Sequence, residues 1–371
     1  MVSFKESLAR NIRINLFATT VVLVCIGTVM IYSASGIYAW EKYKDSLFFL
    51  KRHLIFLILG SFLTFLVMAA DYRRFSRFAK PMLAVSVLLL ILVLIPGIGR
   101  EVAGARRWFR FKAFSFQPSE LANLAMIVYI ADFISRKGEA IKTFSRGFMP
   151  AILVLGMMVL LMLVQPDLGT SVALGIVVFI MLFVAGVKPS YLLSIILISI
   201  PALYLLIFSV PYRRMRITAF LNPWSDPKGS GFQIIQSQIA LGSGGIFGIG
   251  LGQSKQKLFY LPAAHTDFIF SIIGEELGLF GTMAIIILFM IFIQQGLRIM
   301  KHASNKFGYF LALGIVLIIT LKAIINIGVS CGLLPTKGLP LPFISYGGSS
   351  FIFDLISVGI LVNIARTGDY P

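Results

Sequence analysis

The chain has 371 residues, of which 58% are hydrophobic and only 13% are charged, and its formal net charge at pH 7 is +18. Because a soluble domain carries roughly a quarter charged residues, this composition excludes an ordinary soluble protein and indicates one that lies mostly within a membrane. The sequence lacks the alternating apolar and polar pattern of a membrane barrel, so its spanning segments are predicted to be helices.

Ten apolar runs, each about as long as a bilayer core is thick, follow one another along the chain. We therefore predict an all-α polytopic membrane protein with about ten transmembrane helices, forming a single membrane domain over residues 1–371. No clear cleavage site follows the first run, so it is expected to remain as a span. The predicted spans cover residues 16–32, 54–70, 82–98, 114–134, 148–164, 168–187, 191–210, 268–293, 307–332 and 341–364.

Both ends of the chain are predicted to lie in the cytoplasm. An even number of spans puts both ends on one side, and the loops of that side carry their Lys and Arg in short, dense segments. These segments are residues 71–80, 135–146 and 298–307.

The seventh and eighth spans are joined by one long extracellular loop, at about residues 211–267. A loop of this length is usually functional or disordered, and its apolar middle part argues against disorder. The spacing of that part predicts an amphipathic helix that lies against the membrane or packs on the bundle. Its apolar and polar positions at helical spacing are Ile234, Ile235, Gln238 and Ile239.

Lys and Arg of membrane proteins are normally concentrated in the cytoplasmic loops, yet the predicted outer side of this chain is also strongly basic. Residues 99–112 carry five cations and one acid, and the long loop carries Arg213, Arg214, Arg216, Lys228, Lys255 and Lys257. These cations could contact anionic lipid headgroups. Alternatively, they could form a site for an anionic, lipid-linked substrate, because Arg and Lys pair with phosphate oxygens.

Asp267 stands alone at the outer mouth of the eighth predicted helix, beside the basic loop. It could cap the helix, since Asp accepts hydrogen bonds from the free N–H groups of a first turn, although Thr266 could cap equally well. It could instead act as a general base at the water interface. His265 could be a base or a metal ligand, but no nearby His or Cys supports a metal site.

Glu275 and Glu276 follow about two turns into the same helix. Ionisable groups within a span are costly, and we expect these two to be a buried pair, satisfied by groups of neighbouring helices. Lys322 and Asp354 are possible partners for such acids.

Two segments rich in glycine or proline lie on the outer side. The glycine run 242–252 fits no nucleotide-binding motif and indicates a close-packed turn. The segment 333–350 predicts a rigid re-entrant or capping loop, because irregular backbone at membrane depth must be buried in protein. Lys337 in its middle could extend to lipid headgroups or serve a site.

Three long motifs carry a resemblance to a known family. Residues 222–278, "GARRW…FSFQPSELANLA" at 104–125 and "GLLPTKGLPLPFISYGGSS" at 332–350 resemble the SEDS family (shape, elongation, division and sporulation), and the match runs nearly end to end. The wording of "GLGQSKQKLFYLP" and "IIGEELG" is closer to the division and sporulation branches than to the elongation branch. Two positions depart from the family pattern, Ala263 where we expect an acid and Ala103 where we expect Asn.

The resemblance implies a peptidoglycan glycosyltransferase that polymerises lipid II on the outer face of the bacterial cytoplasmic membrane. It implies a class B penicillin-binding protein as transpeptidase partner and other membrane proteins of the division complex. The basic outer loops predict contact with anionic lipids, and no nucleic-acid partner is predicted. Asp267 is the expected catalytic residue. The expected substrate-binding residues are Arg106, Arg107, Trp108, Glu120, Arg213, Arg216, Lys257, His265, Lys337 and Ser349.

The chemistry of polymerisation agrees with these residue types. A sugar hydroxyl must attack an anomeric carbon whose leaving group is a lipid diphosphate, so a carboxylate can take the proton while cations hold the diphosphate. Attack with inversion needs only one such carboxylate, and Asp267 is the single well-placed acid that we identify on the outer side. No cofactor and no metal-ligand cluster is evident, although a divalent cation could help to neutralise the diphosphate.

Two other functions are compatible with the sequence. A transporter that flips lipid II would use the intramembrane acids and Lys322 as a charge relay, but no inverted repeat is visible. A scaffold that only recruits the transpeptidase would not need Asp267. Mutation of Asp267 separates the enzyme from the other two functions, because only the enzyme requires its carboxylate. A transporter would instead lose function when the intramembrane acids are mutated, and a scaffold would depend on its helix surfaces.

Overall fold

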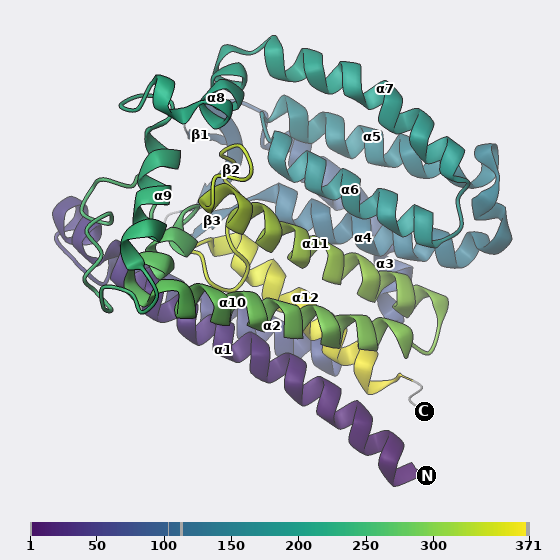
Figure 1. Ribbon diagram of the computed structural model, residues 1–371. Helices are drawn as coiled ribbons and strands as arrows, with labels where there is room; N and C mark the ends of the chain where they lie inside the picture. Colours follow the sequence, from purple (N-terminus) through teal and green to yellow (C-terminus); the bar gives the residue numbers. More distant parts are fainter. Residues whose placement is uncertain (1, 103, 112–113, 369–371) are drawn as a thin grey trace.

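The computed structural model describes residues 2–102, 104–111 and 114–368 and consists mainly of long helices (Figure 1). Ten of them correspond one for one to the predicted spans, which confirms the all-α polytopic fold. Their bounds are α1 Val2–Tyr43, α2 Phe48–Ala69, α3 Arg74–Leu92, α4 Pro118–Lys137, α5 Met149–Val164, α6 Leu168–Val184, α7 Pro189–Phe208, α10 Ile269–Lys301, α11 Lys306–Ser330 and α12 Gly348–Arg366.

Eight of these helices, within the part of the chain that the structure describes, are long and apolar enough to cross a membrane. The other two are α6, which is apolar but has only 17 residues, and α4. Helix α4 is more polar because it carries Glu120, Asn123 and Asp132, and all three side chains are buried. Neighbouring helices therefore surround these polar groups and keep them from lipid.

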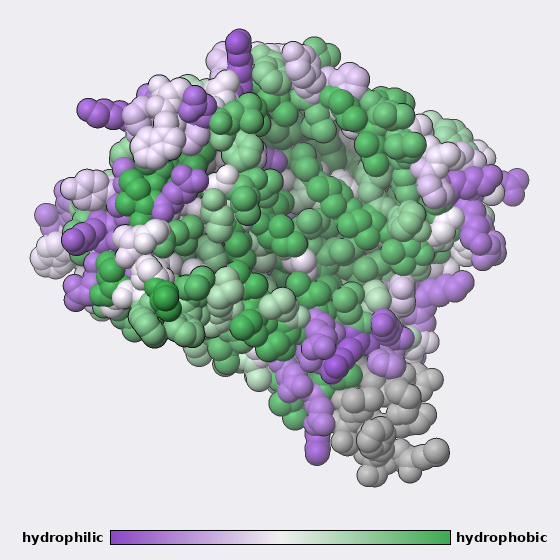
Figure 2. Space-filling view, viewed as in Figure 1, coloured by the Kyte–Doolittle hydropathy of each residue, from purple (hydrophilic) through white to green (hydrophobic). Residues whose placement is uncertain are grey.

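Helices α4, α11 and α12 form the centre of the bundle, whereas α7 lies at its edge (Figure 1). In their most apolar stretches, 83% of the residues of α12 but only 6% of those of α7 are buried. The surface in Figure 2 is apolar across the middle and hydrophilic towards the two ends, as expected for a bundle surrounded by lipid. The beginning of α1 and the end of α12 lie at the same end, as an even number of crossings requires (Figure 1).

A small antiparallel sheet on the outer side was not predicted. Its strands are β1 Arg100–Val102, β2 Ala105–Phe111 and β3 Phe114–Phe116, in the order β1-β2-β3. Arg100 pairs with Trp108, and Phe109 pairs with Phe116. The predicted start of the fourth span at residue 114 was therefore wrong. Helix α4 begins at Pro118, where the missing N–H of proline leaves no hydrogen bond unmade.

The predicted tenth span also began too early, because residues 331–347 form no helix and α12 starts at Gly348. This segment enters the bundle, and the side chains of Leu341, Phe343 and Ile344 are buried. Its backbone lies against α1, where a Cβ atom on Gly27 would come within 2.6 Å of the Ile344 Cα. The prediction of an irregular loop packed inside the protein is thus confirmed.

The long outer loop contains two helices, α8 Pro211–Leu221 and α9 Phe232–Gly244. Helix α9 packs on the bundle, where the Ser237 hydroxyl lies 2.6 Å from that of Ser271 in α10 and donates to the Ser330 carbonyl at 2.7 Å. Ile234 is buried as predicted, whereas Ile239 is 43% exposed, so the buried face is rotated from the predicted stripe.

Candidate active site

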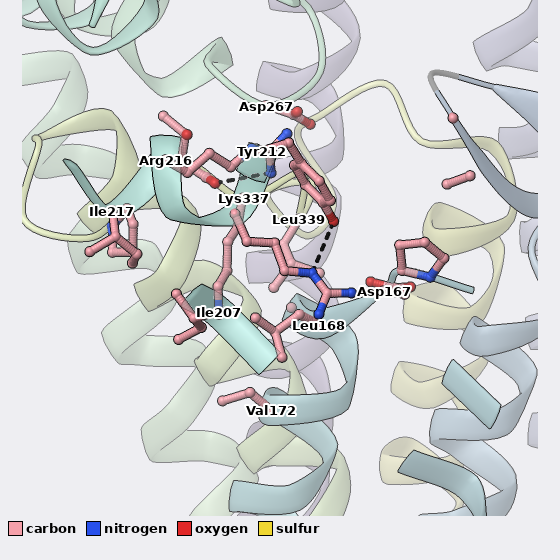
Figure 3. A pocket seen from close by; sticks show the side chains of 18 of the residues that line it. Asp167, Leu168, Val172, Ile207, Tyr212, Arg216, Ile217, Asp267, Lys337 and Leu339 are labelled. Atoms are coloured by element: carbon pink, nitrogen blue, oxygen red, sulfur yellow. Dashed lines mark hydrogen bonds between the residues drawn. The ribbon is translucent and has the colours of Figure 1, made fainter. Parts of the chain in front are cut away.

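A cavity of about 680 Å³ lies among the outer ends of the helices (Figure 3). Five parts of the chain form its walls: β2, the start of α6, the end of α7, helix α8 and the irregular segment before α12. Asp267, which precedes α10, completes the lining. No two of these parts are adjacent in sequence except α7 and α8, so only the folded bundle assembles the cavity.

The upper part of the cavity is polar and the lower part is apolar. Figure 3 shows Asp267 and Arg216 at one end, and Leu168, Val172 and Ile207 towards the other. The apolar side chains come from α6 and α7, the latter being the helix at the edge of the bundle. This arrangement suits a ligand with a charged head and an apolar tail.

Asp267 is held by its backbone, while its carboxylate makes no hydrogen bond or ion pair within the described residues. Its N–H donates to the Ala263 carbonyl at 3.1 Å, and its own carbonyl accepts from the Asn326 amide at 2.9 Å. Helix α10 has no side-chain cap, so the alternative role of Asp267 as a helix cap is wrong. The loop before α12 leaves little room beside it, because a Cβ atom on Gly338 would lie 3.2 Å from its carboxylate.

Burial raises the pKa of Asp267 to about 6, and the positive charge of Arg216 opposes part of this rise. A surface Asp is a weak base because its pKa is near 3.9. A carboxylate with a pKa closer to neutrality remains charged above about pH 6 and accepts a proton more readily. The free carboxylate and its raised pKa are the properties that a general base requires.

Four cations line the same cavity: Arg107, Arg213, Arg216 and Lys337. Among the residues that the structure describes, none of them forms an ion pair with a carboxylate. The three guanidinium groups instead donate to backbone carbonyls, Arg107 to Gln165 and Pro166, Arg213 to Leu206 and Arg216 to Thr336. These bonds orient the cations, and their charges remain available to an anionic ligand.

The sequence analysis missed a second carboxylate in the cavity, that of Asp167. This side chain is buried and caps α6, accepting from the Thr170 N–H at 3.4 Å. It also accepts from Gln117 at 3.3 Å and from Ser119 at 3.5 Å. Asp167 directly precedes an apolar run on the outer side, as Asp267 does, so the same reasoning applied to both acids would have identified it.

The other predicted substrate-binding residues do not line the cavity. Arg106 pairs with Glu101 at 3.2 Å on the surface, and Trp108 lies in β2 opposite Arg100. Ser349 is buried in α12, where its hydroxyl accepts from the Gln117 N–H at 3.1 Å.

His265 packs among aromatic rings, with its ring centre 4.5 Å from that of Phe49 and 5.8 Å from that of Tyr38. Burial lowers its pKa to about 4, with a smaller contribution from Lys42, so the ring is neutral at neutral pH. Ala103, the second departure from the family pattern, lies outside the described residues.

Two buried ion-pair networks contain Lys257 with Glu276, and Lys322 with Glu120 and Asp354. Lys322 lies 2.7 Å from Glu120 and 3.1 Å from Asp354, so it joins α11 to α4 and α12. The suggestion that Lys322 and Asp354 satisfy Glu275 and Glu276 is therefore wrong. Glu276 instead pairs with Lys257 at 2.8 Å.

Glu275 accepts from the Ser254 hydroxyl and from the Lys255 N–H, the latter at 3.0 Å. Together with the pair between Lys257 and Glu276, these bonds fasten the segment 254–257 to α10. The sequence analysis names no metal ligand. Within the described ranges, no group of three or more His, Cys, Asp and Glu residues comes together.

Comparison with known proteins gives consistent matches over nearly the whole chain. Residues 13–370 match the family model for FtsW, RodA and SpoVE, described as "Cell cycle protein". A probable peptidoglycan glycosyltransferase FtsW of Geobacter metallireducens is 50% identical over 345 residues, covering 93% of this chain and 92% of the relative. The stage V sporulation protein E of Bacillus subtilis is 46% identical over 351 residues, covering 95% and 96%.

Solved structures with the same fold include one described as a peptidoglycan synthase complex that coordinates polymerization and crosslinking. Its matching chain has a TM-score of 0.75 and 31% identity, with 95% of this chain and 96% of that chain covered. The rod shape determining protein RodA of Thermus thermophilus has a TM-score of 0.70 and 28% identity, with 95% and 96% covered. This chain therefore belongs to the FtsW/RodA/SpoVE family of membrane proteins, the SEDS family that its motifs resemble.

Proposed function

We propose that this chain is a peptidoglycan glycosyltransferase of the bacterial cytoplasmic membrane, which polymerises lipid II into glycan strands during cell division or in the related shape and sporulation processes. The observation that carries the proposal is the free carboxylate of Asp267, in a cavity with four cations that have no acidic partner among the described residues. The name of its relative in Geobacter metallireducens, a probable peptidoglycan glycosyltransferase, points to the same activity.

In the proposed reaction, Asp267 takes the proton from a hydroxyl of the acceptor sugar. The oxygen of that hydroxyl attacks the anomeric carbon of the donor from the face opposite the leaving group. A new glycosidic bond forms while the bond to the diphosphate breaks, and the diphosphate leaves with the bonding electrons and its polyprenyl chain. A single base suffices because the attack inverts the configuration at the anomeric carbon.

The cavity cations act on the leaving group. Negative charge grows on the diphosphate as its bond to the anomeric carbon breaks, so positive charges fixed at its oxygens stabilise the transition state more than the ground state. Arg107, Arg213 and Arg216 are oriented by backbone carbonyls before the substrate arrives. Little reorganisation is then needed during the reaction. The apolar wall of α6 and α7 would hold the polyprenyl chain.

The transporter alternative has less support in the contacts of the intramembrane charges. Glu276 and Lys322 are buried in ion pairs of 2.8 and 2.7 Å, and neither lines the cavity. Breaking such a pair leaves an uncompensated charge, so these groups are suited to holding helices together. A pure scaffold would not need an unpaired carboxylate beside four cations.

We further propose that the chain works with a class B penicillin-binding protein, which would crosslink the strands as they form. The similarity to a chain of a peptidoglycan synthase complex supports a partner of this kind. Other division proteins and anionic lipids remain predicted partners from the sequence.

The test uses the purified full chain, with and without its transpeptidase, and lipid II as substrate. Glycan polymer is detected on a gel for the wild type, for Asp267→Asn and for the matched control Asp45→Asn. Asp45 lies on the outer side, away from the cavity, in an exposed pair with Lys51. We expect polymer from the wild type and the control, and none from Asp267→Asn. Polymer from all three proteins would refute the assignment of Asp267 as the catalytic base. Polymer from none of them would refute the proposed glycosyltransferase activity.

A further inference from the structure

Asp167 and Lys337 face the same cavity from two different parts of the chain. Asp167 ends the turn before α6, and Lys337 lies on the irregular segment before α12 (Figure 3). The stem of the lysine passes over the first turn of α6, where a Cβ atom on Gly169 would lie 3.5 Å from its Cδ atom. This is an ordinary contact distance, so the lysine stem lies directly against the first turn of α6, two residues from Asp167.

Asp167 is fixed from several sides. Its carboxylate accepts from the N–H of Thr170 in its own helix, and from Gln117 and Ser119 at the start of α4. These three contacts are between 3.3 and 3.5 Å, longer than the usual 2.9–3.0 Å, so they orient the group without consuming its capacity as an acceptor. The buried carboxylate has no cation within ion-pair distance among the described residues.

Lys337 is surrounded by charged groups. The cavity also contains Arg107 from β2, Arg213 and Arg216 from α8, and Asp267 before α10. Burial lowers the pKa of Lys337 and Arg216 lowers it further, while Asp167 raises it. Without Asp167, a partly buried ammonium beside other cations would lose its proton more easily.

We propose that Asp167 is a positioning residue of this site, whose carboxylate keeps the Lys337 ammonium charged and directed into the cavity, where it binds the diphosphate of the lipid substrate. The inference rests on the proposed function for the identity of the substrate. It assigns to the second carboxylate a role different from that of Asp267, because Asp167 acts through Lys337 and takes no proton from the acceptor sugar.

The competing role for Asp167 is that of a helix cap alone, and the two roles separate by substitution. Asn and Ser are as good as Asp at the cap position of a helix, so Asp167→Asn and Asp167→Ser keep the cap and remove the charge. Having both variants protects the test if one of them folds poorly. Lys337→Arg supplies a cation that does not titrate in the accessible range.

The experiment measures polymerisation of lipid II against pH, and separately the binding of a polyprenyl diphosphate to the detergent-solubilised chain against pH. An ammonium binds the diphosphate below its pKa and fails to bind as the pH rises through that pKa. Both neutral variants should therefore lose binding and activity at a lower pH than the wild type, by about half a pH unit or more. Asp45→Asn, which removes an exposed acid outside the cavity, should not change the pH at which binding and activity are lost.

In the Lys337→Arg background, the same substitution of Asp167 should produce no shift, because Arg stays charged. If the wild type and both neutral variants lost binding and activity at the same alkaline pH, the proposal would be overturned, even if activity fell by the same factor at every pH. An equal shift in the Lys337→Arg background would overturn it too, since the effect would then come from another group. Failure of the wild type to polymerise lipid II would refute the proposed function instead, and the binding measurement would still test Asp167.

Discussion

Replacing Asp267 by Asn should abolish polymerisation and at the same time stabilise the fold. The carboxylate is partly buried and has no hydrogen-bond partner among the described residues, so the protein holds its charge at a cost. Asn has nearly the same shape and no charge, and it removes that cost together with the base. A residue kept for catalysis is expected to show this combination of lost activity and gained stability.

The magnitude and its pH dependence follow from the pKa of Asp267, which burial raises from 3.8 to about 6. At about 1.4 kcal/mol for each pKa unit, keeping the folded protein ionised costs at most about 3 kcal/mol. Because the side chain is partly exposed, solvent reduces this to about 1–2 kcal/mol. The cost is fully present above about pH 6, shrinks as the pH falls through the folded pKa, and disappears below the unfolded pKa of 3.8, where the carboxyl is protonated in both the folded and the unfolded states.

Thermal unfolding of the detergent-solubilised protein, followed at pH 4.5 and pH 8 (values chosen about 1.5–2 units either side of that pKa), measures this effect. Asp267→Asn should unfold at a higher temperature than the wild type at the alkaline pH, and the difference should shrink at the acidic pH. Asp45→Asn serves as the control, because its exposed pair with Lys51 contributes little. A variant that is less stable than the wild type, or equally stabilised at both pH values, would show that desolvation of Asp267 is not the cause.

Three more predictions follow from the contacts of this region. Arg216→Ala should raise the pKa of Asp267 further and move the acidic limb of the activity profile above pH 6, and a limb that stays or moves down would contradict the electrostatic coupling between them. Glu276→Gln leaves the buried ammonium of Lys257 unpaired and should destabilise the protein by about 3–5 kcal/mol, measured by thermal unfolding; a change below about 1 kcal/mol would mean that water reaches the pair. Gly248→Ala should lower the unfolding temperature markedly, because Gly248 has φ +79° and an added Cβ would collide with the Glu276 carbonyl; an unchanged unfolding temperature would show that the turn can rearrange.

The helical membrane fold was readable from the sequence because each spanning helix must satisfy its own backbone within one continuous apolar run. The re-entrant segment before α12 was also readable, since its Pro and Gly residues are incompatible with a regular helix. The ends of the spans were less certain. Phe114 and Phe116 are apolar and precede a helix, but residues 114–116 pair with β2 instead of extending α4.

Asp267 and the basic character of the outer side also came from the sequence alone, because an acid at a membrane boundary and cations on the outer face are unusual in any fold. The sequence could not separate the cations that line the cavity from those that form ion pairs inside the fold. Arg216 and Lys257 lie in the same loop, yet Arg216 faces the cavity and Lys257 is buried against Glu276.

Only the tertiary structure decided which polar groups meet. Asp167, Lys337 and Asp267 are far apart along the chain. They share one cavity because α6 and α10 begin at the same level of the bundle as the segment before α12. Lys322 pairs with Glu120 and not with Glu275 because helix rotation directs its side chain towards α4. Composition and periodicity fix where a helix runs along the sequence, whereas its rotation and neighbours follow from the packing of the whole bundle, and these determine the site.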